Sequence, residues 1–392
     1  MLSAETGELA GTAHYTYELV RHLLDFRDRI SGIPEIRSLK FVLFFDGRYS
    51  RDTISVLYRD RILPNVETVF LPVSRLPLLS SHFYLARALR RAKLDVFHSP
   101  AHPLPLFYRG KMIWTVHDLA IYDHPEWFPK GLRKWFATRV TVPRGMRRAV
   151  KLIAPSESTK RDIIRIFNVP EKKIVVIYEG ATEINQNAKI EDQNDNAKFK
   201  NYFLFIGTIE PRKNLVRLID AFIRFRNAEV GPLATAAAAR GPTSLILAGA
   251  SGWKNDDVFM AIERANVKLG KESVQYLGYV SEEEKIALLK NATAFVWPSL
   301  YEGFGLPVLE AMAVGVPVIT SNVSSIPEIT GDTAVLVNPE NIEEIVSAID
   351  RVVRDEALRD QLKTRGLERA KQFTWEKTAR ETLAVYNDCG IH

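Results

Sequence analysis

The chain has 392 residues, of which 46% are hydrophobic and 26% are charged, and its formal net charge is +6 at pH 7. This composition excludes a largely disordered protein, and the length exceeds what one hydrophobic core usually organises, so we expect two globular domains. The single cysteine, Cys389, excludes an intrachain disulfide framework, and no apolar run reaches the roughly 20 residues of a transmembrane helix.

The charge is unevenly distributed along the chain. Residues 1–180 contain 29 Lys and Arg against 18 Asp and Glu, a net charge of +11, whereas residues 181–392 contain 24 against 29, a net charge of −5. A nucleic acid, an anionic membrane or an anionic substrate would each explain the basic front half, as would a solvated face without a partner. The first residues, MLSAETGELAG, lack the charged and apolar regions of a secretory signal, so we expect a cytoplasmic protein.

Short apolar strands alternate with turns and amphipathic helices. The strands are near-continuous runs of Val, Ile, Leu and Phe, which is typical of parallel strands buried on both faces. We expect them at 41–45, 95–98, 112–117, 151–155 and 174–178, and again at 202–207, 244–249, 274–278, 294–298, 317–320 and 334–337. The pattern predicts an α/β protein with two doubly wound, Rossmann-like parallel sheets that face a central cleft.

A polar stretch separates the two sheets. Residues 182–199, TEINQNAKIEDQNDNAKF, carry almost no large apolar side chains and indicate a linker. We therefore expect a first domain at 1–181, a second at 200–374, and a C-terminal helix at 375–392 that packs back on the first domain. The alanine-rich LATAAAAR, residues 233–240, is typical of a surface insertion.

Ligands of open α/β sheets bind beyond the carboxyl ends of the strands. Without any motif, this rule selects the residues at which the expected strands end. They are His98, His117, Ser156, Gly207, Gly249, Gly278 and Pro298. We expect a binding site among these residues and the loops that follow them.

The stretch GTIEPRKN, residues 207–214, leaves one of these strands and leads into a helix. Arg212 and Lys213 fall at the helix entrance, where free N–H groups and the helix dipole already favour an anion. Two cations at that point suit a diphosphate, because Arg binds in a forked geometry and Lys acts as a point charge. The alternative is a surface helix that happens to begin with basic residues.

The stretch YEGFGLPVLE, residues 301–310, places two glutamates eight positions apart around a Gly-Phe-Gly turn. Gly303 and Gly305 let the backbone approach a ligand, so the N–H groups of Phe304, Gly305 and Leu306 can point at phosphate or sugar oxygens. A glycosidase pair is disfavoured, because its carboxylates lie roughly 5 to 10 Å apart. Eight residues span about 12 Å even at helical rise.

Carboxylates bind adjacent hydroxyls well, which suggests one glutamate for each polyol of a nucleotide sugar. Glu310, inside the expected helix, would then hold the ribose, and Glu302, before the helix, the transferred sugar. The alternative is that Glu310 only satisfies the helix dipole.

At this point the sequence resembles a known family. The stretches YEGFGLPVLEAMAVGVPVITSNVSSIPEI, IGTIEPRKN and VQYLGYVSEEEKIALLKNATAFVWPSL are similar to the donor-binding half of the retaining glycosyltransferases of family 4, which have the GT-B fold. The similarity covers nearly all of residues 200–375. It implies that Glu302 contacts the donor sugar, that Glu310 holds the ribose, and that Arg212 and Lys213 clamp the diphosphate.

Further donor contacts follow from the resemblance. The family pattern places the backbone of Gly278, Tyr279 and Val280 near the base. The donor-binding residues expected in all are Gly11, Thr208, Arg212, Lys213, Gly249, Gly278, Tyr279, Val280, Glu302, Gly303, Phe304, Gly305, Leu306 and Glu310.

The front half resembles the family at fewer places. TVHDLAIYDHP, residues 115–125, matches the region where a histidine, here His117, sits at the reaction centre, while His98, Asp118 and Ser156 match segments expected on the acceptor side. The catalytic residues implied are His117, Glu302, Arg212 and Lys213. Family members usually open with a strand before the glycine-rich loop, whereas this sequence begins at the loop, so we expect the first strand to be missing.

One basic and aromatic stretch, residues 127–151, suits an anionic membrane surface, where lipid-linked acceptors reside. Its alternative is an amphipathic core helix with a charged outer face. No module that reads bases is present, so we expect no nucleic acid as a partner.

The resemblance implies a retaining transfer of a hexose from a nucleoside diphosphate sugar to a hydroxyl of a glycan or lipid-linked acceptor, in polysaccharide biosynthesis at the inner face of the membrane. We expect a UDP-sugar such as UDP-glucose as the donor, with GDP-mannose next. No cofactor and no metal are expected, since Asp256 and Asp257 follow a loop glycine rather than a strand end. A nucleotide-sugar epimerase and a non-catalytic carbohydrate-binding protein are the alternatives.

Overall fold

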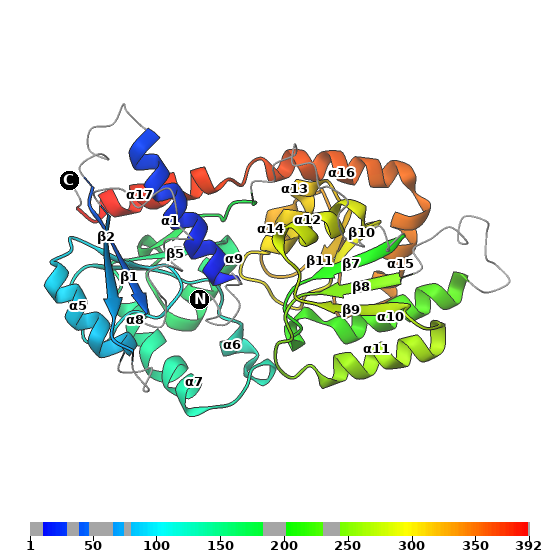
Figure 1. Ribbon diagram of the computed structural model, residues 1–392, viewed down its shortest axis with the longest axis horizontal. Helices are drawn as coiled ribbons and strands as arrows, with labels where there is room; N and C mark the ends of the chain where they lie inside the picture. Colours follow the sequence, from blue (N-terminus) through cyan, green and yellow to red (C-terminus); the bar gives the residue numbers. More distant parts are fainter. Residues whose placement is uncertain are drawn as a thin grey trace. The chain divides into compact units, whose positions relative to one another are not determined.

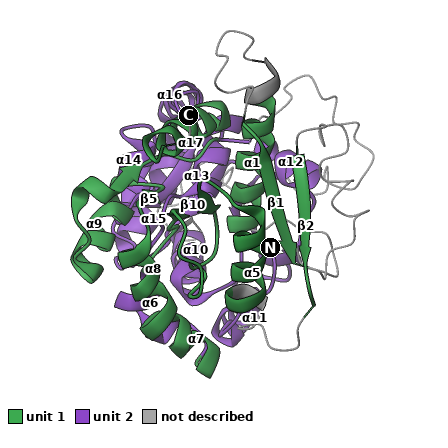
Figure 2. Ribbon diagram, turned by 90° about the vertical axis from the view of Figure 1, so that its left-hand side faces the viewer, with its two compact units in different colours: residues 1–119, 130–180, 374–392 green, residues 120–129, 181–373 purple. Residues whose placement is uncertain are grey.

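The computed structural model describes residues 11–29, 39–46, 66–73, 80–182, 201–229 and 244–390. The predicted linker, apart from its first residue, and the alanine-rich stretch 233–240 lie outside these ranges. The described chain forms two compact units (Figure 2). Unit 1 comprises residues 1–119, 130–180 and 374–392, and unit 2 comprises residues 120–129 and 181–373.

Unit 1 is built on a four-stranded parallel sheet in the order β3-β4-β5-β6, together with a parallel pair β1-β2. Its strands are β1 Phe41–Asp46, β2 Val66–Leu71, β3 Phe97–Ser99, β4 Met112–Thr115, β5 Lys151–Ala154 and β6 Ile174–Val176. Its helices are α1 Thr12–Arg29, α5 Leu85–Ala92, α7 Leu132–Phe136, α8 Val142–Arg148, α9 Glu157–Phe167 and α17 Trp375–Asp388. Strand β4 is buried along its whole length, as expected for a strand covered on both faces.

The C-terminal helix α17 lies beside α1 in unit 1 (Figure 1). Trp375, at the start of α17, is 1% exposed and contacts the rings of His14 and Tyr15 edge-on, with centroid distances of 5.9 and 5.7 Å. Thr374 caps the helix by accepting a hydrogen bond from the N–H of Lys377. The last helix of the chain therefore completes the core of the unit that contains the first helix.

Unit 2 is built on a six-stranded parallel sheet in the order β12-β11-β10-β7-β8-β9 (Figure 1). Its strands are β7 Tyr202–Ile206, β8 Ser244–Ala248, β9 Val274–Gly278, β10 Ala294–Trp297, β11 Val318–Ser321 and β12 Val335–Val337. Its helices are α6 Ala120–Asp123, α10 Leu215–Glu229, α11 Asp256–Leu269, α12 Glu282–Asn291, α13 Leu306–Val314, α14 Ile326–Thr330, α15 Ile342–Arg354 and α16 Glu356–Ala370.

Local sequence explains where the helices next to the site begin. Ser281 and Glu284 form a reciprocal capping box at the start of α12. Pro307 lies in the first turn of α13, where its missing N–H costs nothing, and Gly315 ends that helix at a φ of 79°. Helix α13 is apolar except for Glu310, and its central residues 308–312 are buried, so Glu310 stands out within it as a buried charge.

All eleven predicted strands are present, and the predicted α/β class with two parallel-sheet units is confirmed. Strand β2 was not predicted from the sequence. Its run VETVFL carries an exposed Glu67 and packs in a two-stranded sheet, so it lacks the continuous apolar run of a central strand.

The segment 120–129 corrects the sequence interpretation in two respects. It groups with unit 2, although the sequence places it in the first domain. The ring of Phe128 stacks on Trp253 with a centroid distance of 6.1 Å, and the Trp253 indole donates to the Trp127 carbonyl across 2.9 Å. Trp127 and Phe128 are therefore held by unit 2 and do not lie on the basic helical run that begins at α7.

Candidate active site

The 3₁₀ turn Pro211–Lys213 carries the two cations predicted to bind a diphosphate. It follows β7 and ends at Asn214, whose backbone adopts the left-handed conformation at φ 61°. The Asn214 amide donates to the carbonyl of Pro298 across 3.0 Å, at the exit of β10. The N–H of Leu300 donates to the carbonyl of Arg212 across 2.8 Å. These bonds join the turn to the loop after β10 and bring both predicted motifs into one site.

Lys213 and Glu302 form a buried ion pair in this site. Lys213 Nζ lies 2.6 Å from Oε1 of Glu302, and the two side chains are 7% and 8% exposed. The indole N–H of Trp297 donates to the same oxygen across 3.1 Å. Arg212 lies 3.7 Å from the other oxygen of Glu302 and also pairs with Glu210. Two cations and two carboxylates therefore meet at the carboxyl ends of β7 and β10.

The side chain of Trp297 contacts both Lys213 and Glu302 in this cluster. Its ring stacks on Phe205 with a centroid distance of 4.6 Å and an interplanar angle of 9°, and Lys213 Nζ lies 4.5 Å from its ring centroid. A Cβ at Gly207 would lie 2.6 Å from the indole, so glycine is required there for the ring to fit. The indole is thereby held in one orientation, and its N–H is aimed at Glu302.

Burial and charge act in opposite directions on the ion pair. Burial by itself would raise the pKa of the Glu302 carboxyl, but the charges of Lys213 and Arg212 outweigh it and hold that pKa below its ordinary value. Burial, and then the neighbouring charge of Arg212, lower the pKa of the Lys213 ammonium despite the two carboxylates. The site is a compact network of buried charges, in which removing Lys213 takes from Glu302 its nearest cation and leaves only Arg212 at 3.7 Å.

The loop between β10 and α13 is held by buried hydroxyls. Ser325 Oγ is fully buried and lies 3.0 and 2.7 Å from the carbonyl oxygens of Glu302 and Phe304, which share its single O–H donor. Gly305 adopts a φ of 113°, which favours glycine. Within the described residues, the N–H groups of Gly305 and Leu306 donate to no other group. The loop thus presents backbone donors at the N-terminus of α13, where an anion is favoured.

Glu310 is engaged through one of its two carboxylate oxygens. Lys285 Nζ lies 3.0 Å from Oε1 of Glu310, and the Thr182 hydroxyl donates to the same atom across 2.8 Å. Lys285 also pairs with Glu282 at 2.8 Å. Burial would lower the pKa of Lys285, but the charges of Glu310 and Glu282 outweigh it and raise that pKa. The arrangement fixes Glu310, and among the described residues both of these contacts go to Oε1, which leaves Oε2 as a hydrogen-bond acceptor.

The other predicted donor-binding residues of unit 2 lie in loops at the carboxyl ends of its strands. They are Thr208 after β7, Gly249 after β8, Gly278 to Val280 at the end of β9, and Gly303 after β10. The N–H of Gly249 donates to the carbonyl of Gly278 across 2.7 Å, and a Cβ at Gly249 would lie 2.3 Å from the carbonyl oxygen of Gly207. The strand ends therefore pack backbone against backbone, which only glycine permits.

His117 lies just beyond the end of β4 in unit 1. Its Nδ1 is 3.3 Å from Oε1 of Glu179, and its Nε2 is 2.7 Å from the carbonyl oxygen of Pro100. The ring of Tyr15 meets it edge-on at 4.6 Å. Burial would lower the pKa of His117, but the hydrogen bond and charge of Glu179 outweigh it, so the pKa lies above its ordinary value of 6.5.

The neighbouring His98 belongs to a buried hydrogen-bond chain. Its Nδ1 lies 2.7 Å from the Tyr386 hydroxyl on α17, and its Nε2 lies 2.9 Å from Oγ1 of Thr115. The Tyr15 hydroxyl lies 3.2 Å from the same Thr115 oxygen. Burial, with a smaller contribution from His117, lowers the pKa of His98 to about 3, so this ring is neutral.

The remaining predicted residues of unit 1 have local structural contacts. Ser156 is fully buried and caps α9 by accepting a hydrogen bond from the N–H of Thr159. Gly11 precedes α1 at a φ of 43°. Asp118 follows His117 and contributes to its raised pKa. The structure places His98 inside β3, His117 and Asp118 just beyond the carboxyl end of β4, and Ser156 just beyond that of β5.

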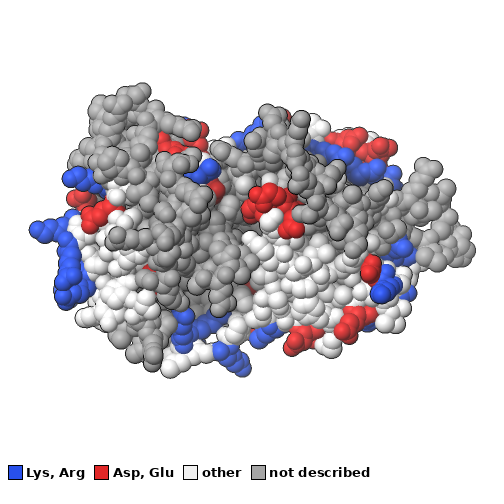
Figure 3. Space-filling model, in the orientation of Figure 1, with Lys and Arg blue, Asp and Glu red and all other residues white. Residues whose placement is uncertain are grey.

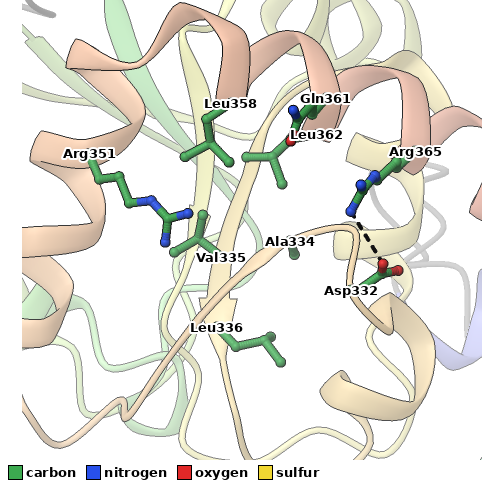
Figure 4. A pocket seen from close by; sticks show the side chains of 9 residues that line it. All are labelled: Asp332, Ala334, Val335, Leu336, Arg351, Leu358, Gln361, Leu362 and Arg365. Atoms are coloured by element: carbon green, nitrogen blue, oxygen red, sulfur yellow. Dashed lines mark hydrogen bonds and ion pairs between the residues drawn. The ribbon is translucent and has the colours of Figure 1, made fainter.

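A pocket of 270 Å³ lies elsewhere in unit 2, beside the edge strand β12 (Figure 4). Arg351 and Arg365 stand on opposite sides of it, with Leu358 and Leu362 between them, and Arg365 pairs with Asp332 at 3.3 Å. It includes none of the predicted site residues. Within the described ranges, no cluster of three or more His, Cys, Asp or Glu side chains is arranged to hold a metal ion.

Three side chains that contact predicted site residues, one in unit 1 and two in unit 2, were not predicted from the sequence. Glu179 follows β6, so the strand-end rule could have selected it. Trp297 and Lys285 carried no signal, because an aromatic residue in a buried strand and a lysine in a charged helix are ordinary. Only their contacts with Glu302 and Glu310 single them out.

Comparison with known proteins accounts for both halves. The model described as Glycosyltransferase Family 4 matches residues 9–182, and the model described as Glycosyl transferases group 1 matches residues 186–369. O-antigen chain mannosyltransferase B of Escherichia coli is 33% identical over 96% of this chain and 96% of its own. O-antigen chain mannosyltransferase RfbU of Salmonella typhimurium is 31% identical over 64% of this chain and 65% of its own.

Solved structures show the same fold. HepE of Anabaena, in complex with UDP and glucose, matches with a TM-score of 0.67 over 97% of both chains, at 19% identity. WaaG, a glycosyltransferase involved in lipopolysaccharide biosynthesis, matches with a TM-score of 0.67 over 96% of both chains, at 13% identity. The chain therefore belongs to the group 1 glycosyltransferases of family 4 and is a hexosyltransferase with the GT-B fold.

Proposed function

We propose that this glycosyltransferase moves mannose, with retention of configuration, from a nucleoside diphosphate sugar to a hydroxyl of a growing polysaccharide or lipid-linked glycan. The observation that carries the proposal is the convergence of Arg212 and Lys213 on Glu302 beside the N-terminus of α13. Cations, a carboxylate and backbone donors together match the phosphates and hydroxyls of such a donor.

Each part of the donor has a matching group. The diphosphate would lie against Arg212, Lys213 and the amides of Gly305 and Leu306, while Glu302 would accept hydroxyls of the transferred sugar. Oε2 of Glu310 would accept a ribose hydroxyl, since Lys285 and Thr182 occupy only Oε1. A charge-assisted hydrogen bond of this kind contributes about 1.5 to 3 kcal/mol.

The chemical step follows from this arrangement. The bond between the anomeric carbon and the phosphate oxygen breaks, and the diphosphate leaves with the bonding electrons. Arg212 and Lys213 stabilise the negative charge that develops on it, in a buried setting where such stabilisation is strong. The acceptor oxygen bonds to the anomeric carbon on the same face, and its proton passes to the leaving phosphate. No protein base is needed in this scheme.

The choice of mannose rests on similarity. The relative from Escherichia coli that matches 96% of the chain is named a mannosyltransferase, and so is the relative from Salmonella typhimurium. We therefore propose GDP-mannose as the first donor to test and UDP-glucose as the second, which reverses the order expected from the sequence.

A panel of GDP-, UDP- and ADP-sugars, incubated with the purified protein with and without a mannan acceptor, tests this proposal through nucleotide release. Acceptor-dependent release of GDP from GDP-mannose is the expected result. An epimerase would convert its nucleotide sugar without an acceptor, and a carbohydrate-binding protein would release no nucleotide. Either outcome would replace the proposal.

We also propose that α7 docks on an anionic membrane at the inner face of the cell membrane. Leu132 and Trp135 on this helix are 82% and 57% exposed, next to Arg133 and Lys134. Figure 3 shows Lys and Arg side chains where Figure 1 places α7. Apolar and cationic side chains together favour a negatively charged lipid surface. Among the described helices, none is long and apolar enough to cross a bilayer.

Co-sedimentation with vesicles tests the docking surface. Vesicles of phosphatidylglycerol should pull down the protein, whereas vesicles of phosphatidylcholine alone should not. The double change Leu132→Ser and Trp135→Ser should release it without affecting transfer to a water-soluble acceptor. Equal sedimentation of this variant and the unchanged protein would exclude α7 as the docking element.

A further inference from the structure

We infer that Glu179 is a positioning residue that holds His117 as a fixed imidazolium, so that His117 serves the reaction as a charge and not as a base. Both ring nitrogens of His117 face acceptors, the Glu179 carboxylate at Nδ1 and the Pro100 carbonyl at Nε2. A neutral imidazole carries one N–H and would set a lone pair against one of these oxygens. The imidazolium donates to both.

The position of Glu179 is built into the fold by α17. Gly180, the next residue, packs so closely on this helix that a Cβ there would lie 2.2 Å from the N atom of Trp375. The Thr378 hydroxyl donates to the carbonyl of Tyr178 across 2.7 Å. Both neighbours of Glu179 are therefore clamped, and the carboxylate, whose side chain is 8% exposed, is held towards His117.

The groups around His117 favour its charged form on balance. Burial lowers the pKa of His117, while Glu179 and Asp118 raise it and outweigh the burial. The charge of His117 in turn lowers the pKa values of the nearby His98 and His102. The Tyr15 ring meets the imidazole edge-on, and burial raises the pKa of its hydroxyl, so tyrosine adds no charge. Glu179 is the one ionic hydrogen-bond partner of His117 among the described residues.

A doubly protonated His117 has no lone pair on nitrogen with which to take a proton. It follows that the acceptor hydroxyl must give its proton to another group, which in the proposed mechanism is the leaving phosphate. The inference rests on the proposed function for this consequence, but the state of His117 itself can be measured without turnover.

Histidine ring signals in nuclear magnetic resonance spectra of the full chain report that state. The His117 signal, assigned from its loss in His117→Gln, should titrate with a raised midpoint in the unchanged protein. In Glu179→Gln, which keeps the shape and removes the charge, the midpoint should fall by roughly 1 to 3 pH units. In Glu179→Asp, which keeps the charge, it should stay near the original value. His124, which pairs with Glu126 on the surface, serves as the internal control in the comparison of the variants.

Activity is then compared with the titration. The pH at which kcat/KM declines should move down together with the His117 midpoint in Glu179→Gln and return in Glu179→Asp. An unchanged His117 midpoint in Glu179→Gln overturns the inference whatever the activity does. A lowered midpoint with an unchanged pH profile supports the pairing and overturns the role of His117 in the proposed reaction. The failures of the two proposals are thereby distinguished.

Discussion

The indole N–H of Trp297 donates a hydrogen bond to the same carboxylate oxygen of Glu302 that Lys213 approaches, with distances of 3.1 and 2.6 Å. Oε1 of Glu302 thus accepts hydrogen bonds from two separate elements. One donor is Trp297, the last residue of β10, and the other is Lys213, in the turn that follows β7. Because both donors are buried, the orientation of Glu302 is set before any substrate binds.

Trp297→Phe tests this relationship. Phenylalanine keeps the stacking on Phe205 and a ring beneath Lys213 but removes the N–H, so kcat should fall by about tenfold or more, in line with one hydrogen bond to a charged group. The matched control is Trp253→Phe. In the unchanged protein the Trp253 indole donates to the carbonyl of Trp127, away from the cluster. Steady-state kinetics of both variants are the measurement, and equal rates would show that the indole N–H is dispensable.

Lys213→Met should both destabilise the fold and abolish transfer. Because it removes the nearest cation from the buried Glu302 and leaves only the more distant Arg212, we expect a loss of about 3 kcal/mol in the free energy of unfolding. The double variant Lys213→Met with Glu302→Gln should regain most of that stability, since no charge is left uncompensated, yet stay inactive. Chemical denaturation and nucleotide release measure the two effects. Recovery of activity in the double variant would contradict a catalytic role for the pair.

Glu310→Gln should weaken recognition of the ribose. In the unchanged protein, a nucleoside diphosphate without one ribose hydroxyl should bind about tenfold more weakly, because it cannot donate to Oε2 of Glu310. In Glu310→Gln this difference should shrink, which calorimetric titration of GDP and its 2′- and 3′-deoxy forms can measure. An undiminished difference in the variant would assign ribose recognition to another residue.

The pKa of Glu302 predicts a pH dependence of stability. Its folded-state pKa lies below the ordinary value of 4.5, so its contribution is fully present above about pH 4.5 and is lost as the pH falls through the folded-state value. The free energy of unfolding should therefore fall less steeply with acidification in Glu302→Gln than in the unchanged protein. Urea unfolding between neutral pH and the acid limit provides the comparison, and parallel curves would refute the assignment.

The local sequence was sufficient to predict most of the scaffold. Strands buried on both faces need continuous apolar runs, so all eleven runs became strands, and Pro307 and the glycines after β10 marked the start of α13. Arg212, Lys213 and Glu302 could be selected as candidates as well, because a helix entrance and a glycine turn lie within a few residues of them, and their roles in donor binding stay predictions.

Only the tertiary structure decided which groups touch. Lys285 meets Glu310 across 25 positions, and Glu179 meets His117 across 62, and no periodicity records such pairs. The segment 120–129 also packs with the second unit through Trp127 and Phe128, although its sequence follows the first. The sequence by itself determined the elements and the kinds of charge at their ends, because these depend on neighbours along the chain. Which group pairs with each buried charge depends on how strands that are distant in the sequence pack together. Such a partner is needed because an unpaired charge in the interior costs a large free energy of desolvation.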